Sequence, residues 1–491
     1  MQVRSSQHRQ HEGEASGRHA IVVGGSIGGM LTARVLADHF DRVTIIERDQ
    51  LPEGSENRPG VPHARHLHFF FKRGLMVAEE LFPGLTADLL AAGSHLLDQG
   101  RDFRILYRSG WSPRKEMGLE FCTFTRPLLE ATIRKHLLAD SQKIEILQGF
   151  EVAGLILDGS RVAGVNVHPR HQDPNAPVET RALAGDLVVD TSGRGSKAPE
   201  WLETSGFAKP EETVVDAFWG YATRIYEPVE DYKKDWKNLL VMNRPPYQPR
   251  AGIIQPIEGN RWLVTIAGVM HDYPPTDEEG FLRFARSLSS PELYRAIEHA
   301  KPLSRIWGYR RTENRLRHYD KLALPAGFAA LGDSVCAFNP VYGVGMTLTG
   351  LEVLALRDGL RKGKGRLDSH RFQKQVAKLV AAPWALTTGE DLRWPATQGG
   401  KITPKVSFMH WYIEQVIRLI PQSEEVFRRF QEVNHMLKGP GALFHPAVLG
   451  PVLRQAFGPK PKAPKHQRAL RPIRPREKHR SGSTSTVAIR H

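Results

Sequence analysis

The sequence predicts an α/β protein in which one α/β domain is interrupted by a second, sheet-rich domain and followed by helices. Two stretches, 19–49 and 327–356, pass from a buried apolar strand through a Gly-rich turn into a helical pattern. Between them, residues 214–270 contain several strand-like apolar runs, and residues 376–457 have a helical pattern. No internal repeat is present, so a single α/β unit should hold an inserted sheet.

Composition places the chain among ordinary soluble globular proteins. It has 491 residues, 40% of them hydrophobic and 25% charged, and no apolar run approaches the roughly 18 residues of a membrane helix. The N-terminal residues lack the apolar core of a secretion signal, and we expect a disordered leader over 1–17. Only two cysteines are present, which favours a reducing, cytoplasmic location.

The net charge of +15 is concentrated at the C-terminus. Residues 459–491 contain ten Lys and Arg against one Glu, a net charge of +9, in a Pro-rich and apolar-poor context. We expect a disordered basic tail. Peripheral contact with an anionic membrane is one role open to it, and nucleic-acid binding is a less favoured one.

The first Gly-rich turn has the pattern of a Rossmann-like dinucleotide site. Gly24 and Gly29 take the first and third glycine positions, Gly28 adds clearance, and Ser26 replaces the middle glycine. The backbone of Ile27 begins a helix whose N-terminus would face a pyrophosphate. Glu47 lies 23 residues after Gly24, where an acid accepts ribose hydroxyls and disfavours NADP.

This turn alone does not distinguish NAD from FAD, but the second Gly-rich stretch favours a flavin. A buried strand ends at Gly332-Asp333, and residues 340–345 lead into a helix at Met346. Asp333 is a suitable acceptor for a polyol hydroxyl, and a helix N-terminus stabilises negative charge on a reduced flavin ring. No second Gly-rich turn for a nicotinamide domain is present.

These stretches resemble FAD-dependent monooxygenases of the p-hydroxybenzoate hydroxylase fold, most of all the branch of polyether epoxidases and squalene-epoxidase-like enzymes. The matching stretches are VVGGSIGGM, VTIIERDQLP, RPGVPHARHLHFFFKRG, FTRPLLE, DTSGRGSKAPEWLE, GDSVCAFNPVYGVGMTLTGLE and TTGEDLRWP, spread over about 19–395. The resemblance implies a Rossmann-like FAD-binding domain of the GR2 type with an inserted β-sheet substrate domain and C-terminal helices. In many relatives the middle motif begins Asp-Gly; here Thr191 replaces that Gly, so a nicotinamide role for the motif is not expected.

The resemblance also implies a set of cofactor-binding residues and a division into domains. The predicted FAD contacts are Gly24, Ser26, Ile27, Gly28, Gly29, Glu47, Arg48, Arg58, Arg126, Asp190, Gly193, Gly332, Asp333, Pro340, Gly343, Gly345 and Met346. The FAD-binding domain should comprise 18–102, 123–205 and 311–375, with a substrate-domain hairpin at 103–122, the substrate sheet at 206–310, helices at 376–458 and the tail at 459–491.

The expected activity is insertion of one oxygen atom from O2 through a flavin C4a-hydroperoxide, with NADPH, NADH or a separate flavin reductase as electron source. The resemblance alone implies that the substrate is a hydrophobic, natural-product-like molecule that is epoxidised or, as the second candidate, hydroxylated. Because the flavin carries the chemistry, no catalytic side chain is predicted, and no metal site is expected from His63, His66 and His68. His66, His68, Trp219 and Tyr221 are candidate pocket residues.

Two other functions stay open. A flavin-dependent reductase of isoprenoid double bonds would share this fold without consuming oxygen stoichiometrically. A binding protein that acts through the basic tail would leave the flavin body inactive. A flavin halogenase is disfavoured because the sequence has no Trp-x-Trp-x-Ile-Pro stretch.

Overall fold

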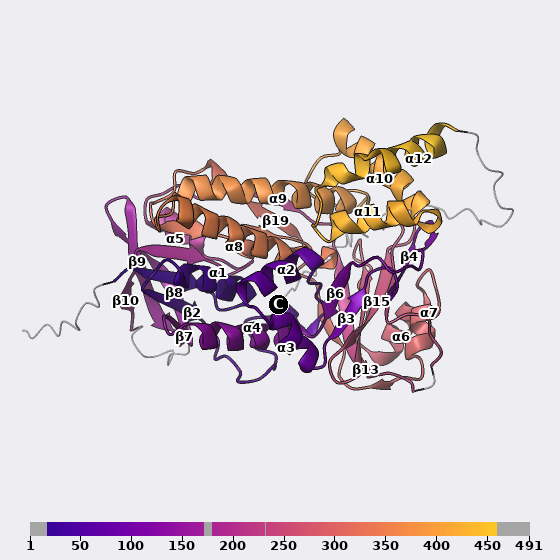
Figure 1. Ribbon diagram of the computed structural model, residues 1–491, viewed down its shortest axis with the longest axis horizontal. Helices are drawn as coiled ribbons and strands as arrows, with labels where there is room; N and C mark the ends of the chain where they lie inside the picture. The colour runs from indigo at the N-terminus through magenta and orange to yellow at the C-terminus, as the bar shows by residue number, and fades with distance from the viewer. Residues whose placement is uncertain (1–16, 171–178, 231, 459–491) are drawn as a thin grey trace, which may run out of the picture.

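The structure, a computed structural model, describes residues 17–170, 179–230 and 232–458 (Figure 1). The basic tail and nearly all of the predicted leader lie outside the described residues.

A five-stranded parallel sheet, in the order β20-β11-β1-β2-β7, forms the centre of the first domain. Its strands are β1 (His19–Val23), β2 (Arg42–Glu47), β7 (Ile144–Gln148), β11 (Leu187–Asp190) and β20 (Phe328–Ala330). Every residue of β1 is buried, as expected for a central parallel strand covered on both faces. The register places Val23 beside Asp190 and Asp190 beside Ala330. The loops that follow these three strands therefore meet at one edge of the sheet.

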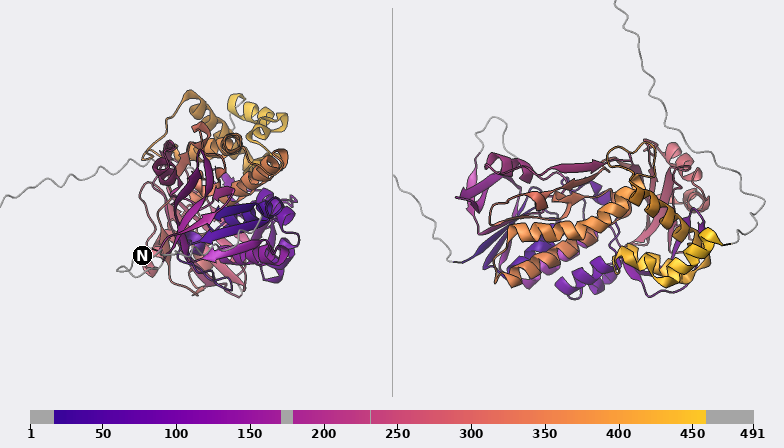
Figure 2. Two further views of the ribbon diagram at one scale, coloured as in Figure 1. Left: turned by 90° about the vertical axis from the view of Figure 1, so that its left-hand side faces the viewer. Right: turned by 90° about the horizontal axis from the view of Figure 1, so that it is seen from above.

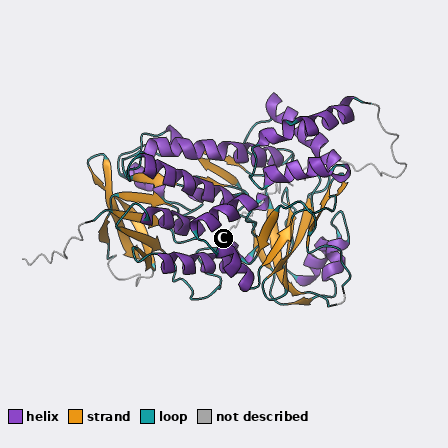
Figure 3. Cartoon of the chain, in the orientation of Figure 1, coloured by secondary structure: helices purple, strands orange, loops and turns teal. Residues whose placement is uncertain are grey.

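Helices cover one face of this sheet and a small antiparallel sheet packs on the other (Figure 1, Figure 3). The helices of this domain are α1 (Ile27–Ala37), α2 (Lys72–Leu81), α3 (Leu85–Ala91), α4 (Arg126–Asp140), α5 (Ala198–Thr204), α8 (Gly345–Lys362) and α9 (Ser369–Asp391). The small sheet consists of β8 (Phe150–Asp158), β9 (Arg161–Pro169) and β10 (Arg181–Ala184). The apolar residues of these layers form one continuous core.

An eight-stranded mixed sheet forms the second domain, at the opposite end of the molecule from β8–β10 (Figure 3). It consists of β4 (Phe103–Tyr107), β5 (Gly110–Trp111), β13 (Gly220–Glu227), β14 (Asn238–Val241), β15 (Arg250–Ile257), β16 (Arg261–Gly268), β17 (Lys301–Pro302) and β18 (Trp307–Tyr309). Helices α6 (Glu278–Arg286) and α7 (Glu292–Ile297) share a buried core with one face. Two smaller sheets join the domains, β3 (His95–Asp98) with β6 (Glu120–Thr123), and β12 (Glu212–Val215) with β19 (Asn314–Arg317) and β21 (Cys336–Ala337).

The hairpin at 103–122 is predicted from two apolar runs, FRILY (103–107) and LEFCTF (119–124), and these two runs do not pair with each other. Strand β4 turns back at once and pairs with β5, and its other edge pairs with β14 of the second domain. Strand β6 instead pairs with β3. The buried carboxylate of Asp98 explains this, because it accepts hydrogen bonds from the backbone N–H groups of Met117 and Gly118 and so ties the entry of β6 to the end of β3.

The C-terminal helices are α10 (Pro404–Leu419), α11 (Glu424–Asn434) and α12 (Pro446–Phe457). They lie beside the second sheet, at the end of the molecule away from β8–β10 (Figure 1, Figure 2). Their apolar residues, among them Ile413, Val416 and Phe427, pack with Phe103 and Ile105 of β4 in a core of their own. These helices therefore pack on the second domain and cover part of its sheet.

Candidate functional site

The first Gly-rich turn has the tight geometry that its glycines predict. Gly24 has φ +101°, and a Cβ there would lie 2.9 Å from the carbonyl oxygen of Thr191. A Cβ on Gly29 would lie only 1.8 Å from the Gly24 carbonyl oxygen. Gly28 faces α8, where a Cβ would meet Thr349 at 3.1 Å. Gly24 and Gly29 thus shape the turn, and Gly28 allows α1 to approach α8.

The N-terminus of α1 is open to an anion. Ser26 occupies the cap position, but its side chain makes no capping hydrogen bond, and the N–H groups of Ile27 to Gly29 lie in the uncapped first turn. Arg126 lies beside this end, with Nη2 donating to the Ser26 hydroxyl at 2.5 Å. Three free N–H groups, a helix dipole and a guanidinium together suit a pyrophosphate.

The acid predicted to bind ribose, Glu47, is buried at the end of β2. Its carboxylate accepts hydrogen bonds from the N–H groups of Gly25 (2.8 Å) and Asp49 (2.9 Å). Its Oε1 lies 3.0 Å from Nη1 of Arg58. These contacts fix the Glu47 carboxylate beside the turn. Arg48, by contrast, is exposed and donates to the Gly60 carbonyl oxygen at 2.9 Å.

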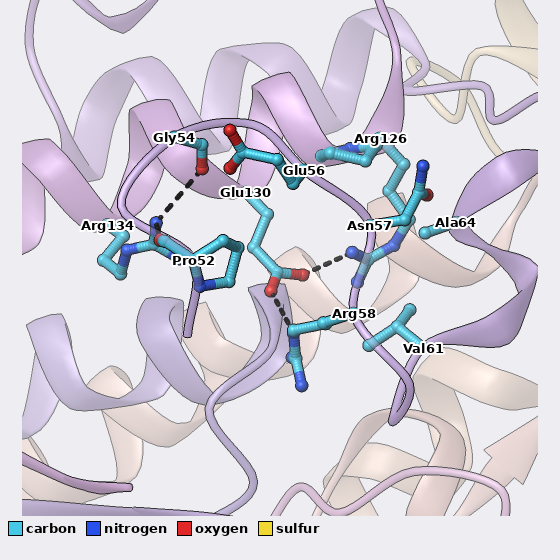
Figure 4. A pocket seen from close by; sticks show the side chains of 11 residues that line it. Pro52, Gly54, Glu56, Asn57, Arg58, Val61, Ala64, Arg126, Glu130 and Arg134 are labelled. Atoms are coloured by element: carbon cyan, nitrogen blue, oxygen red, sulfur yellow. Dashed lines mark hydrogen bonds and ion pairs between the residues drawn. The ribbon is translucent and has the colours of Figure 1, made fainter. Parts of the chain in front are cut away.

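Arg58 and Arg126 belong to a buried charge cluster that also contains Glu130 (Figure 4). Nε of Arg58 donates to Glu130 at 2.7 Å, its Nη1 donates to Asp49 at 2.8 Å, and Arg126 pairs with the other oxygen of Glu130. Burial works to raise the pKa of Glu130, but the two arginines outweigh it and lower that pKa. Nη2 of Arg58 and Nε of Arg126 are buried and have no hydrogen-bond partner among the described residues. These two donors remain for a ligand.

Asp333 lies in the 3-10 turn Gly332–Ser334 that follows β20. Among the described residues its carboxylate has no hydrogen-bond partner, although it is deep in the molecule and only partly accessible. Burial raises its pKa, and Arg194, Arg126 and Arg317 oppose that rise. A Cβ on Gly345 would lie 3.5 Å from Oδ1 of Asp333, which places the carboxylate at the start of α8. A polyol hydroxyl would supply the missing partner.

The N-terminus of α8, like that of α1, has no side-chain cap. The turn Pro340–Tyr342 leads through Gly343, with φ +68°, to Gly345 and Met346 in the first helical turn, and Val344 provides no side-chain cap. At the strand end just before it, the N–H of Gly332 donates to the buried carboxylate of Glu352 at 2.5 Å. The residues of both Gly-rich turns therefore fit FAD, with hydrogen-bond acceptors for hydroxyls and helix ends for the anionic groups.

Asp190 and Thr191 of the middle motif hold the turns together from inside the protein. The buried Asp190 carboxylate accepts hydrogen bonds from the hydroxyls of Ser192 and Ser196, each at 2.6 Å. The Thr191 hydroxyl lies 2.9 Å from the Val23 carbonyl oxygen and 3.0 Å from that of Gly24. Gly193, with φ +85°, has open space where a Cβ would stand. Gly195 of the same motif also has open space at that position.

The histidines His63, His66 and His68 form a neutral cluster between the domains. Nδ1 of His68 donates to the His66 carbonyl oxygen at 2.9 Å, so neutral His68 accepts at Nε2 from Nδ1 of His63, 3.0 Å away. His66 contacts the hydroxyl of Thr223 at 2.8 Å and the ring of Tyr221. Burial lowers the pKa of His66 to about 4 and that of His68 to about 3. No cluster of three or more His, Cys, Asp or Glu side chains that could hold a metal occurs in the part of the chain that the structure describes.

A cavity of about 530 Å³ lies between the second sheet, α8, α9 and the C-terminal helices. Of the four predicted pocket residues, only Trp219 lines it, while His66, His68 and Tyr221 lie outside its wall. Its apolar wall includes Phe69, Phe103, Tyr107, Leu240, Met242, Leu348, Leu351, Leu386, Trp394, Ile413, Ile417, Phe430 and Leu443. Val341, Tyr342 and Val344 also line it, so the cavity reaches the uncapped end of α8.

A buried carboxylate that the sequence did not single out, Asp391 in α9, fixes one side of this cavity. It accepts hydrogen bonds from the Trp219 indole (2.9 Å), the Tyr342 hydroxyl (2.6 Å) and the Asn314 amide (2.6 Å). Burial raises its pKa to about 6. Asp391 lies within the quoted stretch TTGEDLRWP, but only the fold brings it to Trp219 and Tyr342.

Comparison with solved structures shows the fold of FAD-dependent flavoproteins. The flavin-dependent brominase Bmp2, in a triple mutant, matches with a TM-score of 0.61 and 12% identity over 88% of this chain and 98% of that one. A flavoprotein/dehydrogenase of Cytophaga hutchinsonii gives 0.60 and 13% over 90% and 98%. The p-nitrophenol 4-monooxygenase PnpA of Pseudomonas putida DLL-E4 gives 0.55 and 15% over 86% and 98%. The predicted fold class, a Rossmann-like FAD domain with a substrate domain, is confirmed.

The chain therefore has the fold of the class of proteins that contains FAD-dependent monooxygenases and halogenases. By sequence, the chain belongs to the same family as Protein Rv3254 of Mycobacterium tuberculosis. The two are 32% identical over 384 residues, which cover 76% of this chain and 80% of the relative. No model of a known protein family matches the chain.

Proposed function

We propose that this protein is an FAD-dependent monooxygenase that acts on a hydrophobic substrate held in the cavity at the end of α8. The observation that carries the proposal is the meeting of two features at one place. The residues suited to the ribityl chain and the flavin ring, Asp333 and Gly343 to Met346, lie where Val341, Tyr342 and Val344 open onto the apolar cavity.

FAD, when bound and reduced, supplies the activation of oxygen. One oxygen atom of O2 enters the substrate, and the other leaves as water with two electrons and two protons. We infer that NADPH or NADH, directly or through a separate flavin reductase, provides the electrons.

The chain's own residues bind, orient and exclude water. Arg126 and the α1 N-terminus would hold the pyrophosphate, Glu47 the adenosine ribose and Asp333 the ribityl hydroxyls. The aromatic and aliphatic wall of the cavity would position the substrate and exclude water. His63 and His68, neutral and hydrogen-bonded to each other, add no cation next to Arg126 and Arg194.

The apolar cavity supports an alkene or an activated ring as substrate, and the sequence resemblance favours epoxidation of a polyketide or terpenoid. Hydroxylation is the second candidate. The fold neighbours include brominases, so halide is included in the test, together with the reductase of isoprenoid double bonds.

The experiment is a screen of apolar alkenes with the FAD-loaded protein, NADPH and measured O2, in the presence and absence of bromide. A monooxygenase consumes one O2 for each product that gains one oxygen atom, with or without bromide. A product that gains bromine, or that gains two hydrogens without O2 uptake, would overturn the proposal in favour of a halogenase or a reductase. A Leu351→Trp variant, which narrows the cavity, should lower turnover while its flavin content stays unchanged.

A further inference from the structure

Exposed aromatic side chains gather on the outer face of α10 and α12, where the described chain ends. Phe408 is 49% exposed, Trp411 37%, Phe444 36% and Phe457 77%. Their rings form a connected group: Trp411 lies 5.8 Å from Phe408 and 6.3 Å from Phe457 between centroids, and Phe444 stacks on buried Tyr412 at 4.4 Å. We call Phe408, Trp411, Phe444 and Phe457 the aromatic patch.

The surroundings of this patch are positively charged. Lys405 near the start of α10 and Arg454 near the end of α12 are both exposed. The only acidic residue within the two helices is Glu414, which pairs with Arg108 at 2.6 Å. The basic tail, with ten Lys and Arg and one Glu, begins directly after Gly458, next to Phe457.

We propose that the aromatic patch and the basic tail together dock this protein on the surface of a membrane that contains anionic lipid. Trp and Phe side chains are stabilised in the interfacial region of a bilayer, and clustered Lys and Arg are attracted to its anionic headgroups. Stable peripheral binding generally requires two such signals, and here the basic tail directly follows Phe457 and Gly458 in the sequence. No helix among the described residues is long and apolar enough to span a bilayer, so the contact is peripheral.

The position of the patch relates it to the cavity. In the segment Pro440–Phe444, Leu443 lines the cavity while the next residue, Phe444, belongs to the patch. In α10, Ile413 and Ile417 line the cavity and Trp411 faces outward. Figure 1 shows α10 and α12 at one corner of the molecule, away from the parallel sheet. Docking would therefore bring the outer wall of the cavity to the lipid. The docking itself does not depend on the proposed oxygen chemistry.

The test is co-sedimentation of the full-length protein with vesicles of phosphatidylcholine alone or with about 30% phosphatidylserine. Three variants are compared: Phe408→Ser/Trp411→Ser/Phe457→Ser, a truncation after Gly458, and the matched control Leu138→Ser. Leu138 is 48% exposed on α4, far from the patch in sequence. We expect binding only to the vesicles that contain phosphatidylserine, a loss of about tenfold or more in each of the first two variants, and none in the control.

Several outcomes would overturn the proposal. If the wild-type protein does not bind the vesicles, the proposal is wrong. If the triple variant still binds, the aromatic patch has no part in docking and the tail alone is attracted non-specifically. A dimer in solution that the triple substitution disperses would assign the patch to a second copy of the chain. Tight binding of single-stranded RNA that competes with vesicles and needs the same aromatic residues would assign it to nucleic acid. Flavin content of each variant, measured alongside, reports whether the body of the protein is intact.

Discussion

Around the N-terminus of α1, the protein buries Arg58, Arg126 and Glu130 as charged groups that neutralise one another, whereas the cavity beyond α8 is walled by rings and aliphatic chains. The charged residues of the cavity lining have ion-pair partners outside it: Glu390 pairs with Arg393, and Lys438 with Glu432. The first region is built for a ligand of fixed shape and charge. The second is built to exclude water and accept an apolar molecule. Substitutions that damage one region should therefore leave the other region intact.

The largest expected effect is that of Gly29→Ala in the first region. The new Cβ would lie 1.8 Å from the Gly24 carbonyl oxygen, so the turn cannot keep its shape. We expect about 3 kcal/mol or more of destabilisation and loss of bound flavin. The matched control is Gly389→Ala in α9, where nothing lies within 4 Å of the new Cβ and helix propensity improves. Thermal unfolding measures the stability of the two variants, and the visible flavin spectrum measures their bound flavin. Equal stability of the two variants would contradict the geometry of the turn.

The next effect is that of Glu130→Gln, which leaves two buried arginines short of a partner. We expect a loss of about 3 kcal/mol at neutral pH. Because the folded-state pKa of Glu130 lies below its ordinary value of 4.5, its contribution is fully present above that value and is lost as pH falls through the lowered pKa. The stability difference between wild type and variant should therefore shrink in acid.

Urea unfolding across acid to neutral pH measures this difference. The control Glu425→Gln removes an exposed partner of Arg428 and Arg429 on α11 and should cost no more than about 0.5 kcal/mol. A pH-independent difference for Glu130→Gln would show that the carboxylate is not the source of the effect.

Most of the first region could be predicted from the sequence, because local motifs specify it. The strand, turn and helix around Gly24 and the turn at Asp333 occur where the sequence places them. Glu130 was not predicted, although its spacing of four residues from Arg126 on one helix face was a usable signal. The cavity could not be predicted, because it is assembled from β4, β14, α8, α9, α10 and α11, and no motif marks such distant apolar residues as neighbours.

Smaller effects are expected for two aspartates of the first region, one of which should change FAD affinity and the other the stability of the flavin-free protein. Asp333→Asn removes a carboxylate that has no partner among the described residues, and we expect FAD affinity to fall about tenfold to a hundredfold while the flavin-free protein is at least as stable. Asp190→Asn breaks hydrogen bonds to Ser192 and Ser196 and should destabilise the flavin-free protein by about 1–3 kcal/mol. FAD titration measures the change in FAD affinity, and thermal unfolding of the flavin-free proteins measures the change in stability. Unchanged FAD affinity in Asp333→Asn would contradict the assignment of this carboxylate to the cofactor.

The smallest effect is expected at the cavity, for Asp391→Asn. The carboxylate holds Trp219 and Tyr342, so the substitution should weaken binding of an apolar fluorescent dye a few-fold without changing flavin content. Since burial raises the pKa of Asp391 to about 6, its protonated form favours the folded state, and the wild type should lose stability as pH rises from about 4 through 6. Asp391→Asn should lack that loss. If the Asp391→Asn variant also lost its flavin, the cavity wall and the cofactor site would be one mechanical unit and not two separable regions.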